Sequence, residues 1–450
     1  MSWLAHEWRL LARSRICGFA LLLLLAITSA SVACGLHEIR RQQESIERLG
    51  ALNDTELARL ANRHARGESA GYAAYYSFHH TWDAPSVSAF AALGLRDVAP
   101  YALRVRALGL QAQLHEGETF NPEMALPGKF DFAFVLIYIA PLILIALLHD
   151  LVSSERQSGR LRMLLAMSGA RGSPWLRRVG LRFALVLACM ALPLLAGALW
   201  SGVSAGVLAA MLSIVAGYLA FWTGLAFFVA TVGMRSTTNA TLLMGLWALL
   251  TLALPALANV GVTRMAPVQQ GVDLMLAQRQ DIHAAWDRPR DATMAAFFQT
   301  HPEWKDTSPL PWGFHWKWYY AFQQLGDERV ADQAKAYRDG LLRRQRWTRR
   351  LGDFLPGVGA QAALHRLADT DLEAQLAFQD RITAFHGEVR RFYYPYVFDE
   401  VAFTREDFLK APRFRLTERA ADAAPDATWS IWLLALVLFV ASIRAARRIG

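Results

Sequence analysis

The sequence predicts an all-α membrane protein with six transmembrane helices and two mainly helical extracytoplasmic regions. Apolar residues make up 54% of the 450 residues, and they gather in long blocks instead of short periodic segments. The blocks approach the roughly 20 residues that a helix needs to cross a bilayer. Arginines gather beside the ends of the blocks that six crossings would place on one side. By the positive-inside rule, that side is the cytoplasm.

Six apolar segments are expected to cross the membrane, and the polar segments between them follow from that topology. The six segments are residues 16–36, 130–148, 183–200, 205–232, 238–257 and 429–443, of which the third to fifth lie within 183–257. Both termini (1–15 and 444–450) and the loop 149–182 then lie in the cytoplasm. The long polar stretches 37–129 and 258–428 face outward, because long loops cross the membrane regardless of their own charge.

The N-terminal segment allows two interpretations. Residues 1–15 alternate bulky apolar with polar side chains, which predicts an amphipathic helix on the cytoplasmic membrane face. A merely basic flank for the first helix is the alternative. Ser31-Val32-Ala33-Cys34 is typical of a cleaved leader with a lipidated Cys34. The apolar run is long for a leader, and Ser31 stands where leucine is usual, so an uncleaved anchor is favoured.

The polar regions are expected to be helical. Apolar residues of 37–66 recur at helical spacing, and Asn53-Asp54-Thr55-Glu56 predicts a break with a new cap near the middle. Prolines within 85–127 predict several short elements. Residues 315–354 are expected to form one long helix, and 371–391 a second. All three cysteines lie in or beside apolar segments, so no disulfide is expected in these regions.

The second apolar segment passes directly into a short basic loop with a distinctive pattern. A Glu-x-x-x-Gly-x-Leu sequence is followed by two more leucines. A short helix here would place the leucines on one face. That face can enter a groove on a partner while the arginines meet an acidic rim. An ordinary basic loop at the cytoplasmic face is the alternative. The candidate partner-binding residues are Glu155, Arg156, Gly159, Arg160, Leu161, Leu164 and Leu165.

This junction resembles the second transmembrane helix and coupling loop of ABC-2 type transporter permeases. In that family the helix ends in a Glu-x-x-x-Gly-x-Leu pattern, which Glu155, Gly159 and Leu161 match, followed by a Leu-Leu or similar pair. The family commonly has Thr where this chain has Arg160, and often Pro where it has Ser168. These two differences concern the fine contacts of the loop.

Two further segments carry the same resemblance. Residues 236–240, followed by Trp247, are similar to the small-residue start of the family's fifth helix. Residues 364–371, with Phe378, resemble part of the second insertion in a subgroup with large extracytoplasmic insertions after helices one and five. The resemblance implies the permease subunit of an ATP-driven exporter in a bacterial inner membrane. Its implied partners are two copies of an ABC ATPase subunit, a second permease subunit and the lipid bilayer.

Several absences narrow the function. No GxxxxGK[ST] loop is present, so ATP hydrolysis is expected on a separate subunit. The interiors of the six segments carry no Asp, Glu, Lys, Arg or His, which disfavours an ion-coupled carrier. The net charge of +9 is attributed to topology, so no nucleic acid partner is expected. A membrane-anchored sensor or scaffold without transport activity is the alternative function, which the short cytoplasmic segments disfavour.

No catalytic residue, cofactor or metal site is predicted. No two histidines have the i, i+4 spacing of a helical metal site and none lies in a Cys/His cluster, so all of them, including His79-His80 near Asp83, are interpreted as packing or surface residues. The aromatic cluster of residues 304–320 is interpreted as a belt at the headgroup level of the outer leaflet. A substrate-binding surface is the alternative for this cluster. The sequence does not identify the transported substrate.

Overall fold

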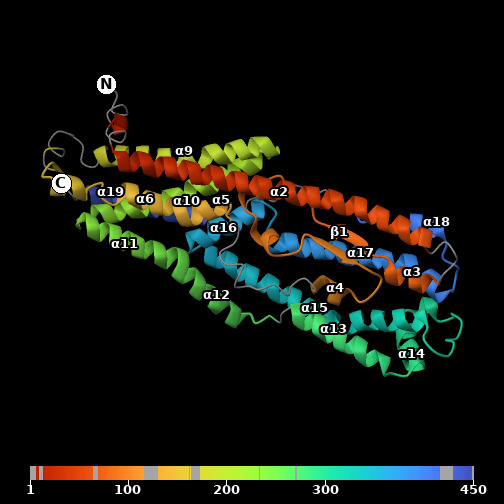
Figure 1. The fold of residues 1–450 in the computed structure, drawn as a ribbon. Helices are drawn as coiled ribbons and strands as arrows, with labels where there is room; N and C mark the ends of the chain where they lie inside the picture. Colours follow the sequence, from red (N-terminus) through yellow and green to blue (C-terminus); the bar gives the residue numbers. More distant parts are fainter. Residues whose placement is uncertain are drawn as a thin grey trace.

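The fold is elongated, with the membrane helices at one end and a large polar domain at the other (Figure 1). A computed structural model describes residues 7–9, 14–63, 69–115, 130–161, 163, 173–232, 234–268, 271–415 and 429–447. Six helices of the described residues are long and apolar enough to cross a membrane, where the sequence predicts them. The prediction of an all-α membrane protein with six spans is therefore confirmed.

The six spans form one bundle around the fourth. They are α2 (Arg15–Arg63); α5 (Phe132–Phe134), η5 (Val135–Ile139) and α6 (Ala140–Leu148); α9 (Ser173–Ser201); α10 (Ala205–Thr231); α11 (Ser236–Ala248), η6 (Leu249–Ala253) and α12 (Leu254–Met265); and α19 (Trp429–Ala446). Helix α10 packs against α6, α9 and α19. Its Gly217 and Gly224 lie against α19, and a Cβ at either would come within 3.2 Å of side-chain atoms there. Small residues thus let these helices approach closely.

Helix α2 continues far beyond the membrane. Its 49 residues extend about 73 Å, whereas the hydrocarbon core of a bilayer is about 30 Å thick. The predicted break at residues 53–56 is wrong, because the helix runs on to Arg63. Asn53 serves tertiary packing instead of a cap, since its side-chain oxygen accepts a hydrogen bond from the His80 backbone N–H at 3.3 Å.

The polar domain consists of residues 69–115 and 271–415. Its elements are α3 (Ala70–Tyr76), β1 (His79–Trp82), η1 (Ala89–Ala91), η2 (Gly94–Asp97), β2 (Ala102–Val105), α4 (Leu110–His115), α13 (Gly271–Trp286), α14 (Arg290–Thr300), η7 (Pro302–Trp304), α15 (Trp316–Gly352), α16 (Pro356–Leu367), α17 (Leu372–Phe398) and α18 (Arg405–Lys410). The long predicted helix is present as α15. The second predicted helix is present as the longer α17, and Asp371 caps its start by accepting the Ala374 N–H at 3.0 Å. The antiparallel pair β1–β2 was not predicted, because its strands have only four residues each.

The two segments of the polar domain share a single hydrophobic core. Val105 and Leu110 of the first segment pack in one cluster with Phe322, Phe378 and Val389 of the second. Polar contacts join the segments as well. The Asp327 carboxylate accepts the Leu110 N–H at 2.7 Å, and the same side chain pairs with an arginine of α17 at 2.6 Å. Neither segment therefore has a complete core of its own.

The aromatic cluster of residues 304–320 lies far from the spans, so its interpretation as a membrane belt is wrong. Helix α15 begins at Trp316, and its 37 residues extend about 55 Å. The other half of α15 reaches the membrane bundle: Arg344 donates to the Ala266 carbonyl at the end of the fifth span at 2.8 Å, and Gly352 lies against α16. The aromatic rings pack on α3 instead, where Tyr75 and Tyr319 have ring centroids 5.8 Å apart. The number of residues between this cluster and the nearest span in the sequence does not reveal how far apart the two lie in the structure.

The polar domain inserts two segments between the membrane helices. Helix α16 packs on α10, and its Ala360 and Leu364 belong to the hydrophobic core of the bundle. At the tip of α16, a Cβ on Gly357 would lie 3.6 Å from the Tyr218 hydroxyl oxygen. The turn η1 brings the buried Phe90 against α2 and α9, into the same core. We call these two segments, 89–93 and 356–368, the plug.

Hydrogen bonds hold the two halves of the plug together and fix them to the second span. The Ser88 hydroxyl donates to the Leu367 carbonyl at 2.8 Å, and the Thr370 hydroxyl donates to the Ala92 carbonyl at 2.8 Å. Asp131 caps the second span by accepting the Phe134 N–H at 2.8 Å. Its other carboxylate oxygen accepts the Leu93 N–H of the plug at 2.8 Å.

The second and fifth spans each contain one π-helical turn, and a proline follows each turn by two residues. The turns are η5 and η6, and the prolines are Pro141 and Pro255. Proline has no N–H and its ring clashes with the carbonyl four residues earlier, which disfavours the regular α-helical hydrogen bond at that position. For Pro141 that carbonyl belongs to Ile137, and the buried Tyr218 hydroxyl donates to it at 3.0 Å. Tyr218 also interacts with Thr251 in the second π-helical turn.

Replacing Tyr218 with Phe should destabilise the protein. The substitution leaves the Ile137 carbonyl without the donor that Tyr218 supplies, which costs about 1 kcal/mol. Thermal unfolding of the purified protein in detergent measures the effect. Tyr138→Phe removes a hydroxyl from the same bundle as a matched control and should leave the melting temperature nearly unchanged. Equal melting temperatures for wild type and Tyr218→Phe would contradict the assigned role of this bond.

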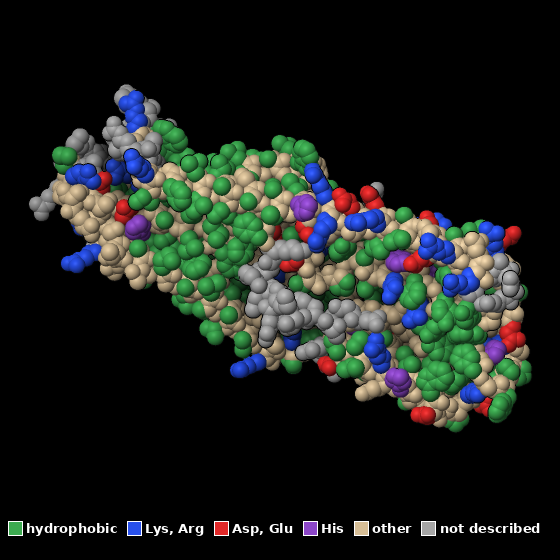
Figure 2. Space-filling model, viewed as in Figure 1, with side chains coloured by type: hydrophobic (Ala, Val, Ile, Leu, Met, Phe, Trp, Pro, Cys, Tyr) green, Lys and Arg blue, Asp and Glu red, His purple; other side chains and the backbone are tan. Residues whose placement is uncertain are grey.

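The charge distribution predicts which end of the bundle faces the cytoplasm. Lys and Arg side chains gather at the end of the bundle opposite the polar domain, here called the loop end (Figure 2). In a cysteine-free background, Trp312→Cys in the polar domain, where Trp312 is fully exposed, should react with a membrane-impermeant maleimide on intact cells. Gln157→Cys, at the exposed loop end, should react only after permeabilisation. The reverse labelling would overturn the topology.

Candidate functional site

The candidate coupling residues follow the second span at the loop end. Helix α6 ends at Leu148, and the short helix α7 (Ser153–Gln157) follows after one turn. Gly159 ends α7 with a φ of +71°, and its N–H donates to the Arg156 carbonyl at 3.1 Å. A Cβ at this position would meet no atom within 4 Å. The backbone conformation, and not the available space, therefore favours glycine here.

Glu155 is the centre of a row of ion pairs. One carboxylate oxygen contacts Arg178 of α9 at 3.0 Å, and the other contacts Arg160 at 2.9 Å. Arg178 also contacts Glu7 of the N-terminal segment at 3.2 Å. The Glu155 and Arg178 side chains are only 13% and 15% exposed. Such a pair is less screened than one at the surface, so removing one partner leaves a poorly solvated charge. We call these four residues the brace.

The third and fifth spans hold the same end of the second span. The Arg178 guanidinium lies over the buried Trp175 ring at 5.4 Å, a cation–π contact. Arg182 donates to the Leu147 carbonyl. The Asn239 side chain donates to the His149 carbonyl at 3.1 Å. The last carbonyls of a helix have no N–H donors within the helix, and the side chains of Arg182 and Asn239 supply those donors here.

The structure places the predicted residues in two different environments. Glu155 is half-buried in the brace, whereas Arg156, Gly159 and Arg160 are exposed on the loop surface. Leu161 is half-buried and packs against the core of the membrane bundle. Two predicted positions, Leu164 and Leu165, lie outside the described residues, as does most of the predicted amphipathic segment 1–15.

Sequence reasoning missed the residues that hold the loop. Arg178 and Arg182 counted only as part of a basic flank, and Asn239 only as part of the start of the fifth span. Glu7 is separated from Arg178 by 171 positions in the sequence, which include the first two spans. The only available signal was a lone acidic residue before the first span, beside a loop rich in arginine.

The arrangement of the loop suits mechanical contact with a partner. The exposed surface of residues 156–160 is carried on a helix that ion pairs fix to the third span. Within the described ranges, no three His, Cys, Asp or Glu side chains are grouped to hold a metal ion. His79 in the polar domain is an example of packing: it contacts the Pro412 carbonyl at 3.2 Å and the Tyr393 hydroxyl at 3.3 Å. Burial lowers the pKa of His79 to about 4, so it is neutral at pH 7.

Comparison with known proteins gives one match. Residues 273–417 match the family model described as a domain of unknown function, DUF3526. The match begins within α13 and includes α18, so it contains the α16 part of the plug. The comparisons with curated proteins and with solved structures found no match.

The brace predicts a specific pattern of stability changes. Glu155→Arg alone should destabilise the protein by about 1–3 kcal/mol, because it places two cations together near the bilayer boundary. Arg178→Glu combined with Glu155→Arg should recover much of that loss by restoring the pair with reversed charges. Arg160→Ala is the matched control, since its side chain is 60% exposed and an exposed pair contributes little.

Thermal unfolding and trypsin cleavage of the loop in inside-out vesicles measure these changes. Cleavage after Arg156 should accelerate in Glu155→Arg and slow again in the double variant. If the double variant is less stable than both single variants, the charges do not interact as described.

Proposed function

We propose that the chain is the permease subunit of an ABC-2 type exporter in a bacterial inner membrane. In this proposal the loop end and both termini face the cytoplasm, and the polar domain faces outward. The braced loop after the second span carries the proposal. Its family-like Glu-x-x-x-Gly-x-Leu pattern begins on the short helix α7 and continues beyond it, with residues 156–160 exposed for a partner. ATP hydrolysis takes place on a separate ATPase subunit, and the chain itself is not an enzyme.

The contacts suggest how an ATPase would move the membrane helices. Force on the exposed part of the loop would pass through Glu155 to Arg178 and the third span. It would also pass along the second span to Asp131, which binds the plug through the Leu93 N–H. The route therefore joins the ATPase side to the opposite side of the membrane through one helix and its two caps.

A second permease subunit completes the proposed exporter. The fifth span is the least buried of the six, with 11% of its most apolar window inside the single chain. It presents exposed large side chains along its length, among them Leu249, Leu252 and Leu257. This surface supports pairing with a second copy or a related chain in the bilayer. Two ATPase subunits would then bind the two loops.

Site-specific photocrosslinking tests the proposal. A photoreactive amino acid at Gln157, which is exposed on the loop, should crosslink in native membranes to a protein with a GxxxxGK[ST] motif. The control position is Leu409, 71% exposed in the polar domain, which should give no such product. Mass spectrometry of the crosslinked bands identifies the partner.

A second measurement separates partner binding from folding. Arg156→Glu, at an exposed position of the loop, should leave the protein in the membrane but reduce recovery of the ATPase on co-purification. Gln157→Ala is the matched control, because it changes an exposed side chain that the proposal does not require. An ATPase absent from the Gln157 crosslinks, or captured equally from Leu409, would refute the assignment of the loop.

A further inference from the structure

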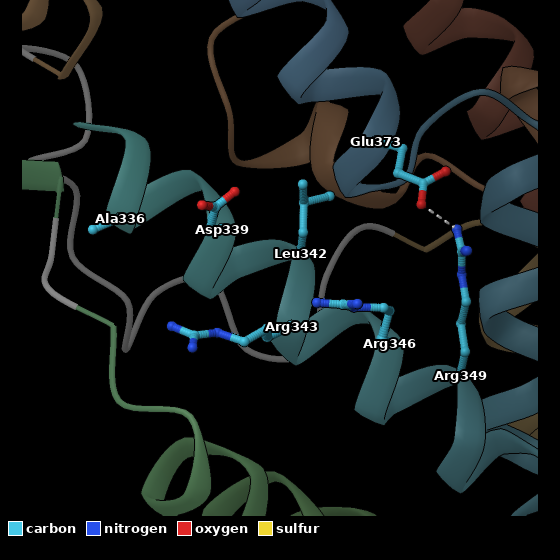
Figure 3. A pocket seen from close by; sticks show the side chains of 7 residues that line it. All are labelled: Ala336, Asp339, Leu342, Arg343, Arg346, Arg349 and Glu373. Carbon is cyan, nitrogen blue, oxygen red and sulfur yellow. Dashed lines mark hydrogen bonds and ion pairs between the residues drawn. The ribbon is translucent and has the colours of Figure 1, made fainter. Parts of the chain in front are cut away.

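Arginines line one face of α15 near its end at the membrane. With Glu373 of α17 they border a cavity of about 720 Å³ (Figure 3). In Figure 3, Arg343 extends away from α15 and Arg346 lies back along the helix, both towards the left of the view, whereas Arg349 turns towards Glu373 and pairs with it at 2.6 Å. The residues bordering the cavity are Ala336, Asp339, Leu342, Arg343, Arg346, Arg349 and Glu373.

A second cavity, of about 360 Å³, begins at the same Arg349 and reaches the sixth span. Its polar side includes Arg350 and Arg366, together with the carboxylates of Asp353 and Asp371. The Asp371 carboxylate is occupied as the cap of α17. Its apolar side is made by Ala362 and Ala363 of α16 and by Trp429 and Ile431 of α19. The two cavities share Arg349 and are here called together the arginine groove; charged side chains line the first, and the second has an apolar wall as well.

The arginine groove lies at the boundary of the membrane spans. Helix α15 ends at Gly352, and the tip of α16 just beyond it reaches Tyr218 inside the bundle. The last turns of α15 therefore stand where the spans end. Trp429, the first residue of the sixth span, lies beside them. Tryptophan is enriched at headgroup level, and arginine readily extends its charge to the same level.

Arg343 and Arg346 form a like-charged pair. They lie three residues apart on the helix, so their positive charges are neighbours, and the one carboxylate of α15 that borders the same cavity is Asp339, a turn before Arg343. Among the described residues, neither has an ion-pair partner, whereas Arg349 and Arg366 share Glu373. An anion bound between the two guanidinium groups would remove their repulsion. Planar guanidinium groups bind phosphate oxygens in pairs, which makes phosphate the fitting anion.

We propose that the arginine groove binds the phosphate group of an anionic lipid from the leaflet on the side of the polar domain. Arg343 and Arg346 contact the phosphate, and the acyl chains follow the apolar wall of α16 and α19 into the bilayer. The apolar wall favours a lipid over free phosphate, because free phosphate has no acyl chains that could contact that wall. This binding does not depend on the proposed export function.

Lipid retention by the purified full-length chain tests the site. The protein is reconstituted in phosphatidylcholine nanodiscs containing phosphatidylglycerol, then extracted in mild detergent and examined by native mass spectrometry. Wild type should retain phosphatidylglycerol in preference to phosphatidylcholine. Arg343→Gln with Arg346→Gln should reduce that retention about tenfold, as expected for the loss of charge-assisted bonds. The matched control is Arg338→Gln on the same helix, whose arginine pairs with Asp380 away from the groove.

A photoactivatable phosphatidylglycerol on the wild-type protein gives a readout that does not depend on the folding of a variant. It should label peptides of 342–366 or the first turns of α19. Labelling confined to other segments would overturn the proposal, as would equal retention by the double glutamine variant. Displacement of the bound lipid by millimolar inorganic phosphate would show a small-anion site instead, and would also overturn it.

Discussion

The bond between the Tyr218 hydroxyl and the Ile137 carbonyl is the contact on which the rest of the arrangement depends. Pro141 leaves the Ile137 carbonyl without its helical N–H donor, and the buried Tyr218 hydroxyl needs an acceptor. The hydrogen bond between them satisfies both groups where water does not reach. The tip of α16 lies beside the same hydroxyl at Gly357, where a Cβ would be in van der Waals contact with it. The second span, the fourth span and the plug therefore meet at one point.

The second span runs in both directions from this point, and each of its two ends is capped by side chains. On the side of the polar domain, Asp131 binds both its own helix and the Leu93 N–H. At the loop end, Arg182 and Asn239 supply partners to the last carbonyls, and the brace holds α7. Because the π-helical turn lies between the two caps, the helix is fixed at both ends and irregular in between. π-Helical turns and their prolines are common positions for bending.

Local patterns were sufficient to predict the spans, α15 and α17, because block length and helical spacing are properties of neighbouring residues. Contacts between distant segments were not predictable in this way. The N-cap residues near Asn53 suggested a break, but a partner in the β1 strand uses that side chain. The pattern around Glu155 marked a site, while its principal partner, Arg178, lies beyond the loop on another span. The plug had no local signal either, since η1 and α16 resemble ordinary short apolar helices.

The central claim is that the plug and the loop end are linked through the second span. Ala92→Cys and Thr370→Cys, where the native threonine hydroxyl reaches the Ala92 carbonyl at 2.8 Å, allow the plug to be locked with a short thiol crosslinker. ATP hydrolysis is then measured for the reconstituted complex of this chain with its ATPase, before and after crosslinking. The account predicts that locking the plug slows hydrolysis at the opposite membrane face and that cleaving the crosslinker restores it. An unchanged rate in the fully crosslinked complex would contradict the linkage.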